Sequence, residues 1–423
     1  MDLAITGRAW VGGRLSTVTI GIDDGRIVRV GARSVPADRE LVFLDGMILP
    51  GAIDAHVHFR DPGATRKEDF ASGTRAAAQG GVTTVLDMPN TDPPVVTRHA
   101  FARKLAIARR KAAVDFGLYA APREDGALTL GSRPIAYKAY LGPTTGGLRV
   151  APESLSHLFA DATRNRVPVS FHAEDAGCIE EASRRVVVDG PESHARLRPA
   201  RCELEAVRRL LPFVRTGLAH VAHVTTQAAA RILVSSRASF EVTPHHLLLT
   251  EKDLARDVRL KCNPPLRPST DRAFLWRTLS AGKAILASDH APHLPSEKRG
   301  VLSRVEAGVP GVETMVPLLM ARVAAGVLPL RSLVAAACER PADRFGLARK
   351  GRIEPGRDAD LVVYDPKTVA TVEARRLSSK CGWSPFEGFS AVFPTHVFSR
   401  GRQVVEDGRF VGKAGWGREV RRG

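Results

Sequence analysis

Hydrophobic and polar positions follow one rhythm in the middle of this chain and another at its two ends. In the middle, short apolar runs alternate with longer amphipathic stretches, as expected for βα units around a parallel sheet. Near the start, apolar and polar residues alternate in Val18–Ile22 and again in Ile27–Val30, on either side of a turn. Similar signals recur in Asp360–Tyr364 and over 392–405. Both ends therefore favour β-structure.

Eight apolar runs of the middle region predict strands, and eight such units favour a closed (β/α)8 TIM-type barrel. Helix-like segments between them include Lys67–Gln79, His99–Lys111 and Glu203–Val214. We therefore predict an α/β fold in which residues 51–350 form the barrel. Residues 1–50 and 351–423 are expected to form the two parts of a small β-sandwich. The predicted strands are Ala52–His58, Val82–Met88, Val114–Tyr119, Pro134–Leu141, Val167–Phe171, Leu218–Val224, Ser239–Thr243 and Ala284–Ser288.

Composition narrows the class of protein. Of the 423 residues, 44% are hydrophobic and 25% charged, which is ordinary for a globular protein and excludes a disordered chain. The formal charge of +17 raises the question of nucleic acid or an anionic membrane surface. The densest basic clusters, Arg103–Lys111 and Arg418–Arg422, are accompanied by no zinc-finger, helix-turn-helix or aromatic RNA-binding motif. We expect no nucleic-acid partner.

The cysteines and the N-terminus bear on the compartment. The five cysteines show no Cys-x-x-Cys spacing and no even framework, so we expect no disulfide scaffold and a reducing compartment. The segment Met1–Ala4 lacks the basic-then-apolar order of a signal peptide. No apolar run reaches the ~18 residues that a membrane span needs. These features predict a cytoplasmic protein with no membrane partner.

Candidate chemistry collects where the predicted strands end, which is where barrel enzymes place their active sites. The first strand ends in His56 and His58, which alternation directs to the same side. His172, His223 and Asp289 lie at or after the ends of three further strands. One His-x-His pair alone is equally explained by hydrogen-bonded core histidines. Together, four imidazoles and a carboxylate favour a metal such as zinc.

Lys138 interrupts the apolar run Ile135–Leu141. An isolated ammonium group inside a barrel is costly, so it must be paired or neutralised. One alternative is a lysine that reaches solvent or pairs with a carboxylate. The other is a neutral amine that adds CO2, because the resulting carbamate has two oxygens and can bridge two metal ions. The residues alone leave both alternatives open.

Several segments, in this order along the chain, resemble the signature motifs of dihydroorotases in the amidohydrolase superfamily. The similarity spans about residues 45 to 410, and the combination is far more specific than any one piece. The segments are Gly51–Gly63, Lys67–Thr74, Asp87–Thr91, Thr243–His246, Lys261–Arg267, Ala287–His293, Gly308–Thr314 and Trp383–Gly388.

The resemblance implies a centre of two Zn2+ ions. His56 and His58 would bind the first zinc, His172 and His223 the second, and carboxylated Lys138 would bridge both. Asp289 would ligate the first zinc and act as the catalytic acid/base. The implied reaction is the reversible hydrolysis of (S)-dihydroorotate to N-carbamoyl-L-aspartate, which in reverse closes the ring in pyrimidine synthesis.

The resemblance also implies contacts to the substrate. Arg60 would bind its carboxylate, assisted by Asn90 and His293, since a guanidinium is a planar fork for such a group. Thr144, in the glycine-rich loop 142–147, would touch the substrate when that loop closes. The remaining expected substrate contacts are His58, Asn263, Ala307 and Gly308.

The resemblance leaves the substrate ring, the catalytic role and the assembly to be decided, and the chain departs from the family at one position. Allantoinases and hydantoinases share the scaffold, and the pair Arg60 and Asn90 is the feature that favours dihydroorotate over their rings. A ligand-depleted chain of this kind can serve only as a structural partner, although here all six ligand positions are filled. A homodimer, or association with aspartate transcarbamoylase, is the expected assembly. Asp61 stands where the family usually has Glu.

Overall fold

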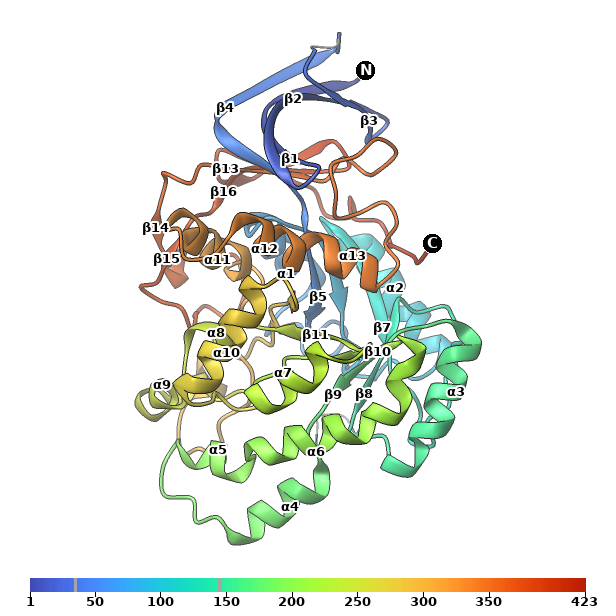
Figure 1. Cartoon of the computed structure of the whole chain (residues 1–423), viewed down its shortest axis with the longest axis vertical. Helices are drawn as coiled ribbons and strands as arrows, with labels where there is room; N and C mark the ends of the chain where they lie inside the picture. Colours follow the sequence, from blue (N-terminus) through green and yellow to red (C-terminus); the bar gives the residue numbers. More distant parts are fainter. Residues whose placement is uncertain (34–35, 144–146) are drawn as a thin grey trace.

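The structure, a computed structural model, describes residues 1–33, 36–143 and 147–423. Two eight-stranded sheets organise these residues, one parallel and one mixed (Figure 1). The strands nearest the N-terminus lie at the top of that view, and the parallel sheet with its helices lies below them. The prediction of a TIM-type barrel accompanied by a β-unit from both chain ends is confirmed.

The parallel sheet forms the barrel, and each of its strands pairs with the next one along the chain. It closes through a parallel bridge between Val57 and His290, where the His58 backbone N–H donates to the His290 carbonyl at 2.8 Å. All eight predicted strands are present. They are β5 (Ala52–Val57), β6 (Val82–Asp87), β7 (Asp115–Ala120), β8 (Ala136–Tyr140), β9 (Val169–His172), β10 (Ala219–Val221), β11 (Ser239–Val242) and β12 (Ile285–Leu286).

Two of these strands stop well before their predicted ends. We expected strand structure to continue to Val224 and Ser288, but β10 ends at Val221 and β12 at Leu286. The backbone then turns into the left-handed region, with φ of 36° at His223 and 45° at Asp289. Hydrophobic patterning does not register such a turn. The bend carries both side chains to the mouth of the barrel.

Helices cover the barrel, and their buried faces supply much of its core. Helix α1 begins at a capping box between Asp69 and Ser72 and packs its buried residues Phe70 and Ala76–Ala78 inward. The helices are α1 (Phe70–Gln79), α2 (Arg98–Lys111), α3 (Leu155–Asn165), α4 (Ala176–Arg185), α5 (Ser193–Leu197), α6 (Ala200–Leu210), α7 (Gln227–Val234), α8 (Pro244–Leu248), α9 (Glu251–Arg256), α10 (Ser269–Ser280), α11 (Met315–Ala324), α12 (Leu330–Val334) and α13 (Arg340–Arg344).

The mixed sheet joins the two ends of the chain. Strand order is β18-β17-β16-β13-β4-β1-β2-β3, and β4 pairs antiparallel with β13 and parallel with β1. The sequence patterns predicted β2, β3, β13 and the pair β16 and β17, but not β1 or β4. The strands are β1 (Leu3–Val11), β2 (Arg14–Asp23), β3 (Arg26–Gly31), β4 (Arg39–Pro50), β13 (Leu361–Tyr364), β16 (Pro394–Ser399), β17 (Arg402–Glu406) and β18 (Arg409–Phe410), with β14 (Ala370–Thr371) and β15 (Ser390–Ala391) pairing separately.

One disulfide, which the cysteine spacing did not predict, joins α4 to α6. Cys178 and Cys202 are bonded with an S–S distance of 2.09 Å, across a sequence separation of 24 residues. The fold, rather than the spacing, brings them together. The other three cysteines are buried and free. Over residues 1–33, 36–143 and 147–423, no helix has the length and apolar character needed to cross a membrane.

Candidate metal centre

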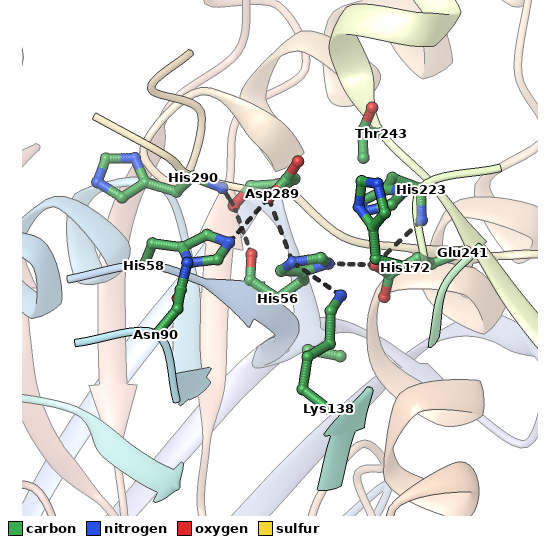
Figure 2. Close-up of polar contacts among 12 residues, drawn as sticks. His56, His58, Asn90, Lys138, His172, His223, Glu241, Thr243, Asp289 and His290 are labelled. Carbon is green, nitrogen blue, oxygen red and sulfur yellow. Dashed lines mark hydrogen bonds and ion pairs between the residues drawn. The ribbon is translucent and has the colours of Figure 1, made fainter. Parts of the chain in front are cut away.

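Six side chains predicted as metal ligands converge at the C-terminal mouth of the barrel (Figure 2). They line one cavity of about 730 Å3, and every one of these residues is buried. The barrel strands β5, β8 and β9 supply His56, Lys138 and His172. The other three, which follow the ends of β5, β10 and β12, are His58, His223 and Asp289.

The first group of candidate ligands consists of His56, His58 and Asp289. The Asp289 Oδ1 lies 3.2 Å from Nε2 of His56 and 3.2 Å from Nε2 of His58. The donor atoms of these three residues all lie within 4.8 Å of one another. The Lys138 amine lies 3.3 Å from the same His56 Nε2, so it stands beside the group.

The second group is a pair of imidazoles. Nδ1 of His172 lies 3.0 Å from Nε2 of His223, with the rings nearly at right angles. The His56 and His223 rings are 5.3 Å apart between centroids, so the two groups are neighbours. Lys138 lies between them in Figure 2.

Three of the four histidines are oriented by an acceptor on the ring nitrogen that faces away from the centre. His56 Nδ1 donates to Glu241 at 2.5 Å, and His172 Nε2 donates to Glu174 at 2.8 Å. His58 Nδ1 donates to the Asn90 carbonyl oxygen at 2.7 Å. Each bond leaves the lone pair of the opposite nitrogen facing the cavity, which is the tautomer that a metal ligand needs.

Burial sets the protonation states of the centre. It lowers the pKa of His58 to about 3 and also lowers the pKa of His172 and His223, so these rings are neutral at pH 7. It lowers the pKa of Lys138 to about 8, which makes the neutral amine accessible. Burial opposes ionisation of Asp289, but the neighbouring His56 and His58 hold its pKa well below the usual range.

The backbone is unusual at three positions of the site. Arg60 has φ of 59°, and His223 and Asp289 have φ of 36° and 45°. Residues other than glycine adopt this left-handed region rarely, at a cost of about 1–3 kcal/mol each, and such positions cluster at functional sites. The fold therefore accepts strain in order to direct these side chains into the cavity.

The donor set fits zinc. Imidazole nitrogens and carboxylates are the ligands that zinc prefers, and the facing lone pairs leave space between them for an ion. A second cluster, His245, His246 and Cys262, also brings possible ligands together. There, however, His246 Nε2 donates to the Pro264 carbonyl and its Nδ1 accepts from Thr243, so hydrogen bonds already occupy both ring nitrogens.

The residues expected to contact substrate line the same cavity, with one lying outside the described residues. Arg60 Nη2 lies 3.3 Å from His293 Nε2. Arg60 Nε and Asn263 Oδ1 are buried and have no hydrogen-bond partner in the part of the chain that the structure describes. Thr144 falls in the segment 144–146, which the structure does not describe. The cavity residues of this set are His58, Arg60, Asn90, Asn263, His293, Ala307 and Gly308.

Sequence reasoning missed the two carboxylates that orient histidines. Glu241 is 1% exposed inside the apolar strand β11, and Glu174 is 0% exposed two residues after His172. For Glu241 the available signal was a charged residue inside an apolar run, the same signal that drew attention to Lys138; Glu174, beyond the end of β9, carried no such signal. Asp61, the noted departure, pairs with Lys111 at 2.7 Å.

Comparisons with known proteins agree with this geometry. The profile of the amidohydrolase family matches residues 47–404. The dihydroorotase of Methanosarcina mazei is 37% identical over 441 aligned residues, covering 97% of this chain and 95% of that protein. The dihydroorotase of Pyrococcus furiosus is 36% identical, covering 100% and 97%. Among solved structures, the L-hydantoinase (dihydropyrimidinase) of Arthrobacter aurescens superposes with a TM-score of 0.95 at 27% identity and covers all of both chains. The chain therefore belongs to the amidohydrolase family and, within it, to the dihydroorotases.

Proposed function

We propose that this enzyme is a dihydroorotase, which interconverts (S)-dihydroorotate and N-carbamoyl-L-aspartate by opening and closing the ring amide. The observation that carries the proposal is the place of Arg60. Its guanidinium lines the cavity that also holds Asp289 and the histidines, and its buried Nε has no hydrogen-bond partner among the residues that the structure describes. A fixed cation beside a hydrolytic centre suits a cyclic amide that carries a carboxylate.

We infer that two Zn2+ ions complete the centre. His56, His58 and Asp289 would hold the first, His172 and His223 the second, and the Lys138 carbamate would touch both. The carbamate forms when the neutral amine adds CO2 and releases one proton, and the lowered pKa of Lys138 favours that step. When bound, zinc polarises the ring carbonyl and lowers the pKa of water.

The side chains of the chain itself handle the proton and the substrate. Asp289 accepts the proton of the attacking water and returns it to the departing ring nitrogen. Arg60 binds the substrate carboxylate, with Asn90 and His293 beside it. Asn263 and the backbone of Ala307 and Gly308 would contact the ring, and Thr144 would do so from its loop.

The main rival is a hydantoinase, because a barrel of nearly the same shape carries that activity. Fold alone does not decide between the two. The deciding experiment incubates the zinc-loaded enzyme separately with dihydroorotate, hydantoin and allantoin. We expect dihydroorotate to give the highest kcat/KM, and faster turnover of either rival ring would overturn the assignment.

Substitution of Arg60 tests the carboxylate contact. Arg60→Met should raise KM for dihydroorotate about 10- to 100-fold with little change in kcat, because the carboxylate does not react. Arg66→Met is the matched control, since the Arg66 side chain is 70% exposed and pairs with Glu297. Steady-state kinetics separate the outcomes, and an unchanged KM in Arg60→Met would contradict the role.

Location and assembly are part of the proposal. We place the enzyme in the cytoplasm, consistent with three buried free thiols. A homodimer, or association with aspartate transcarbamoylase, stays a prediction that light scattering of the chain alone and with that enzyme would check.

A further inference from the structure

A buried ion pair lies beside the metal centre and contacts one of its histidines. Glu174, 0% exposed, accepts from His172 Nε2 at 2.8 Å through Oε2. The same carboxylate accepts hydrogen bonds from Arg198. The Arg198 Nε lies 3.1 Å from both carboxylate oxygens, and its Nη2 lies 2.6 Å from Oε2. His172, Glu174 and Arg198 thus form one chain of contacts beside the cavity, which Arg198 also lines.

The disulfide brackets this ion pair. Cys178 follows Glu174 by four residues, and Cys202 follows Arg198 by four residues. The backbone repeats the link, because the Asp175 N–H donates to the Cys202 carbonyl at 2.9 Å. The cystine therefore ties the segment that carries the carboxylate to the segment that carries the guanidinium.

We propose that Glu174 and Arg198 are positioning residues for His172, and that the Cys178–Cys202 disulfide braces them so that a thiol reductant weakens the second metal position. This inference rests on the proposed metal centre, in which His172 is a ligand. Reduction breaks the S–S bond, forms two thiols and converts two reductant thiols into a disulfide. Disulfides in reducing compartments are typically redox-responsive, which fits such a role.

The position of one hydrogen on the His172 ring links these contacts to metal binding. The bond to Glu174 keeps the proton of His172 on Nε2 and leaves the lone pair on Nδ1, facing His223. Without an acceptor at Nε2 the ring is free to carry its proton on the wrong nitrogen. Arg198 holds that carboxylate in place, since it donates to both oxygens. Outer partners of this kind are worth about 10- to 100-fold in metal affinity.

The first test measures metal affinity directly. Zinc content and competitive zinc titration are compared for the wild type and for Glu174→Gln, together with the visible spectrum of the cobalt-substituted proteins. We expect Glu174→Gln to lose about 10- to 100-fold in affinity at the second position while the first is retained. Arg198→Lys keeps the positive charge, so it should lose less affinity at the second position than Glu174→Gln does.

A matched control lies between α4 and α6, the two helices that the disulfide joins. Arg201 of α6 pairs with Glu181 of α4 at 3.1 Å, and both side chains are nearly half exposed. Glu181→Gln should leave both metal affinities and the cobalt spectrum unchanged. If Glu174→Gln and Glu181→Gln bind metal equally well, the positioning role is wrong.

The second test isolates the brace. Chemical reduction alone is a poor test, because both cysteines are buried and because dithiol reductants chelate zinc. The double variant Cys178→Ser/Cys202→Ser, which lacks the disulfide, is therefore compared with the oxidised wild type. We expect the double variant to bind the second metal several-fold more weakly. A monothiol should weaken that position in the wild type but not in the double variant. Equal affinities for the variant and the oxidised enzyme would overturn the brace.

The readout keeps this inference separate from the proposed function. A wild type that binds two metals but does not turn over dihydroorotate would refute the assigned substrate and leave the positioning argument intact. Normal turnover together with unchanged metal affinity in Glu174→Gln would do the reverse.

Discussion

At the scale of single residues, the partner of the outer ring nitrogen decides what each histidine can do. Glu241, Asn90 and Glu174 each accept from one imidazole of the centre and so aim its other nitrogen at the cavity. His290 has the opposite arrangement. Its Nδ1 accepts from the Gly311 backbone and its Nε2 faces Glu68 at 3.3 Å, so it braces the barrel mouth instead of facing the centre.

Asp289 carries the clearest prediction at this scale. Asp289→Asn keeps an oxygen for the metal but cannot accept the proton of the attacking water. We expect kcat for dihydroorotate to fall by about 10²- to 10⁴-fold, the range typical of a lost general acid/base. Kinetics are measured alongside zinc content, so that loss of metal is distinguished from loss of proton transfer. Near-normal kcat at full zinc occupancy would show that another group moves the proton.

At the scale of elements, the sequence predicts the barrel strands well because of where they lie. A parallel barrel strand is covered on both faces, so it reads as a continuous apolar run. The hydrophobic pattern does not predict β1 and β4, because both carry exposed positions. In addition, β4 pairs with β13, which lies more than 300 residues further along the chain. Strand ends escape the hydrophobic pattern too, because the left-handed turns at His223 and Asp289 leave no hydrophobic trace.

The positions of the candidate ligands could be predicted because they depend on the barrel strands. The predicted ligands follow strands, and parallel strands bring their ends together, so placement could be predicted from order alone. Glu174 and Glu241 could not be predicted in this way. Their roles depend on which ring nitrogen they meet, and only tertiary structure sets that contact.

The start of α11 offers a prediction on pH. Glu313, 4% exposed and just before the helix, accepts from the Ser378 N–H at 2.7 Å, and burial raises its pKa to about 8. Between its unfolded pKa of about 4.3 and this value, the folded chain binds the extra proton, so stability falls as pH rises. Each pKa unit corresponds to about 1.4 kcal/mol, so the loss amounts to at most a few kcal/mol.

Glu313→Gln should remove this dependence, because the amide accepts the same bond without ionising. Urea unfolding at pH 5 and pH 8 compares the variant with the wild type and with Glu124→Gln, a change at an exposed position. We expect the difference between the two pH values to shrink only in Glu313→Gln. Identical differences in all three proteins would mean that Glu313 is ionised without penalty in the fold.

At the scale of the whole molecule, a buried charge network ties the mixed sheet to the barrel. Lys350 Nζ lies 2.6 Å from Asp115 at the start of β7 and 2.7 Å from Asp360, next to β13. It also lies 3.0 Å from Asp358, and Arg400 pairs with Asp115 as well. One ammonium thus contacts three carboxylates that come from both parts of the fold.

Removing that ammonium should separate stability from chemistry. Lys350→Met leaves buried carboxylates without their common partner, which we expect to cost about 3–5 kcal/mol of unfolding free energy. Arg375→Ala, which breaks an ion pair at a side chain 81% exposed, should cost at most about 1 kcal/mol. Thermal unfolding of both variants gives the comparison. Because the network lies at the barrel–sheet junction and Lys350 does not line the cavity, kcat per folded molecule should stay at the wild-type value. A Lys350→Met protein as stable as Arg375→Ala would show that the Lys350 contacts contribute no more to stability than an exposed ion pair does.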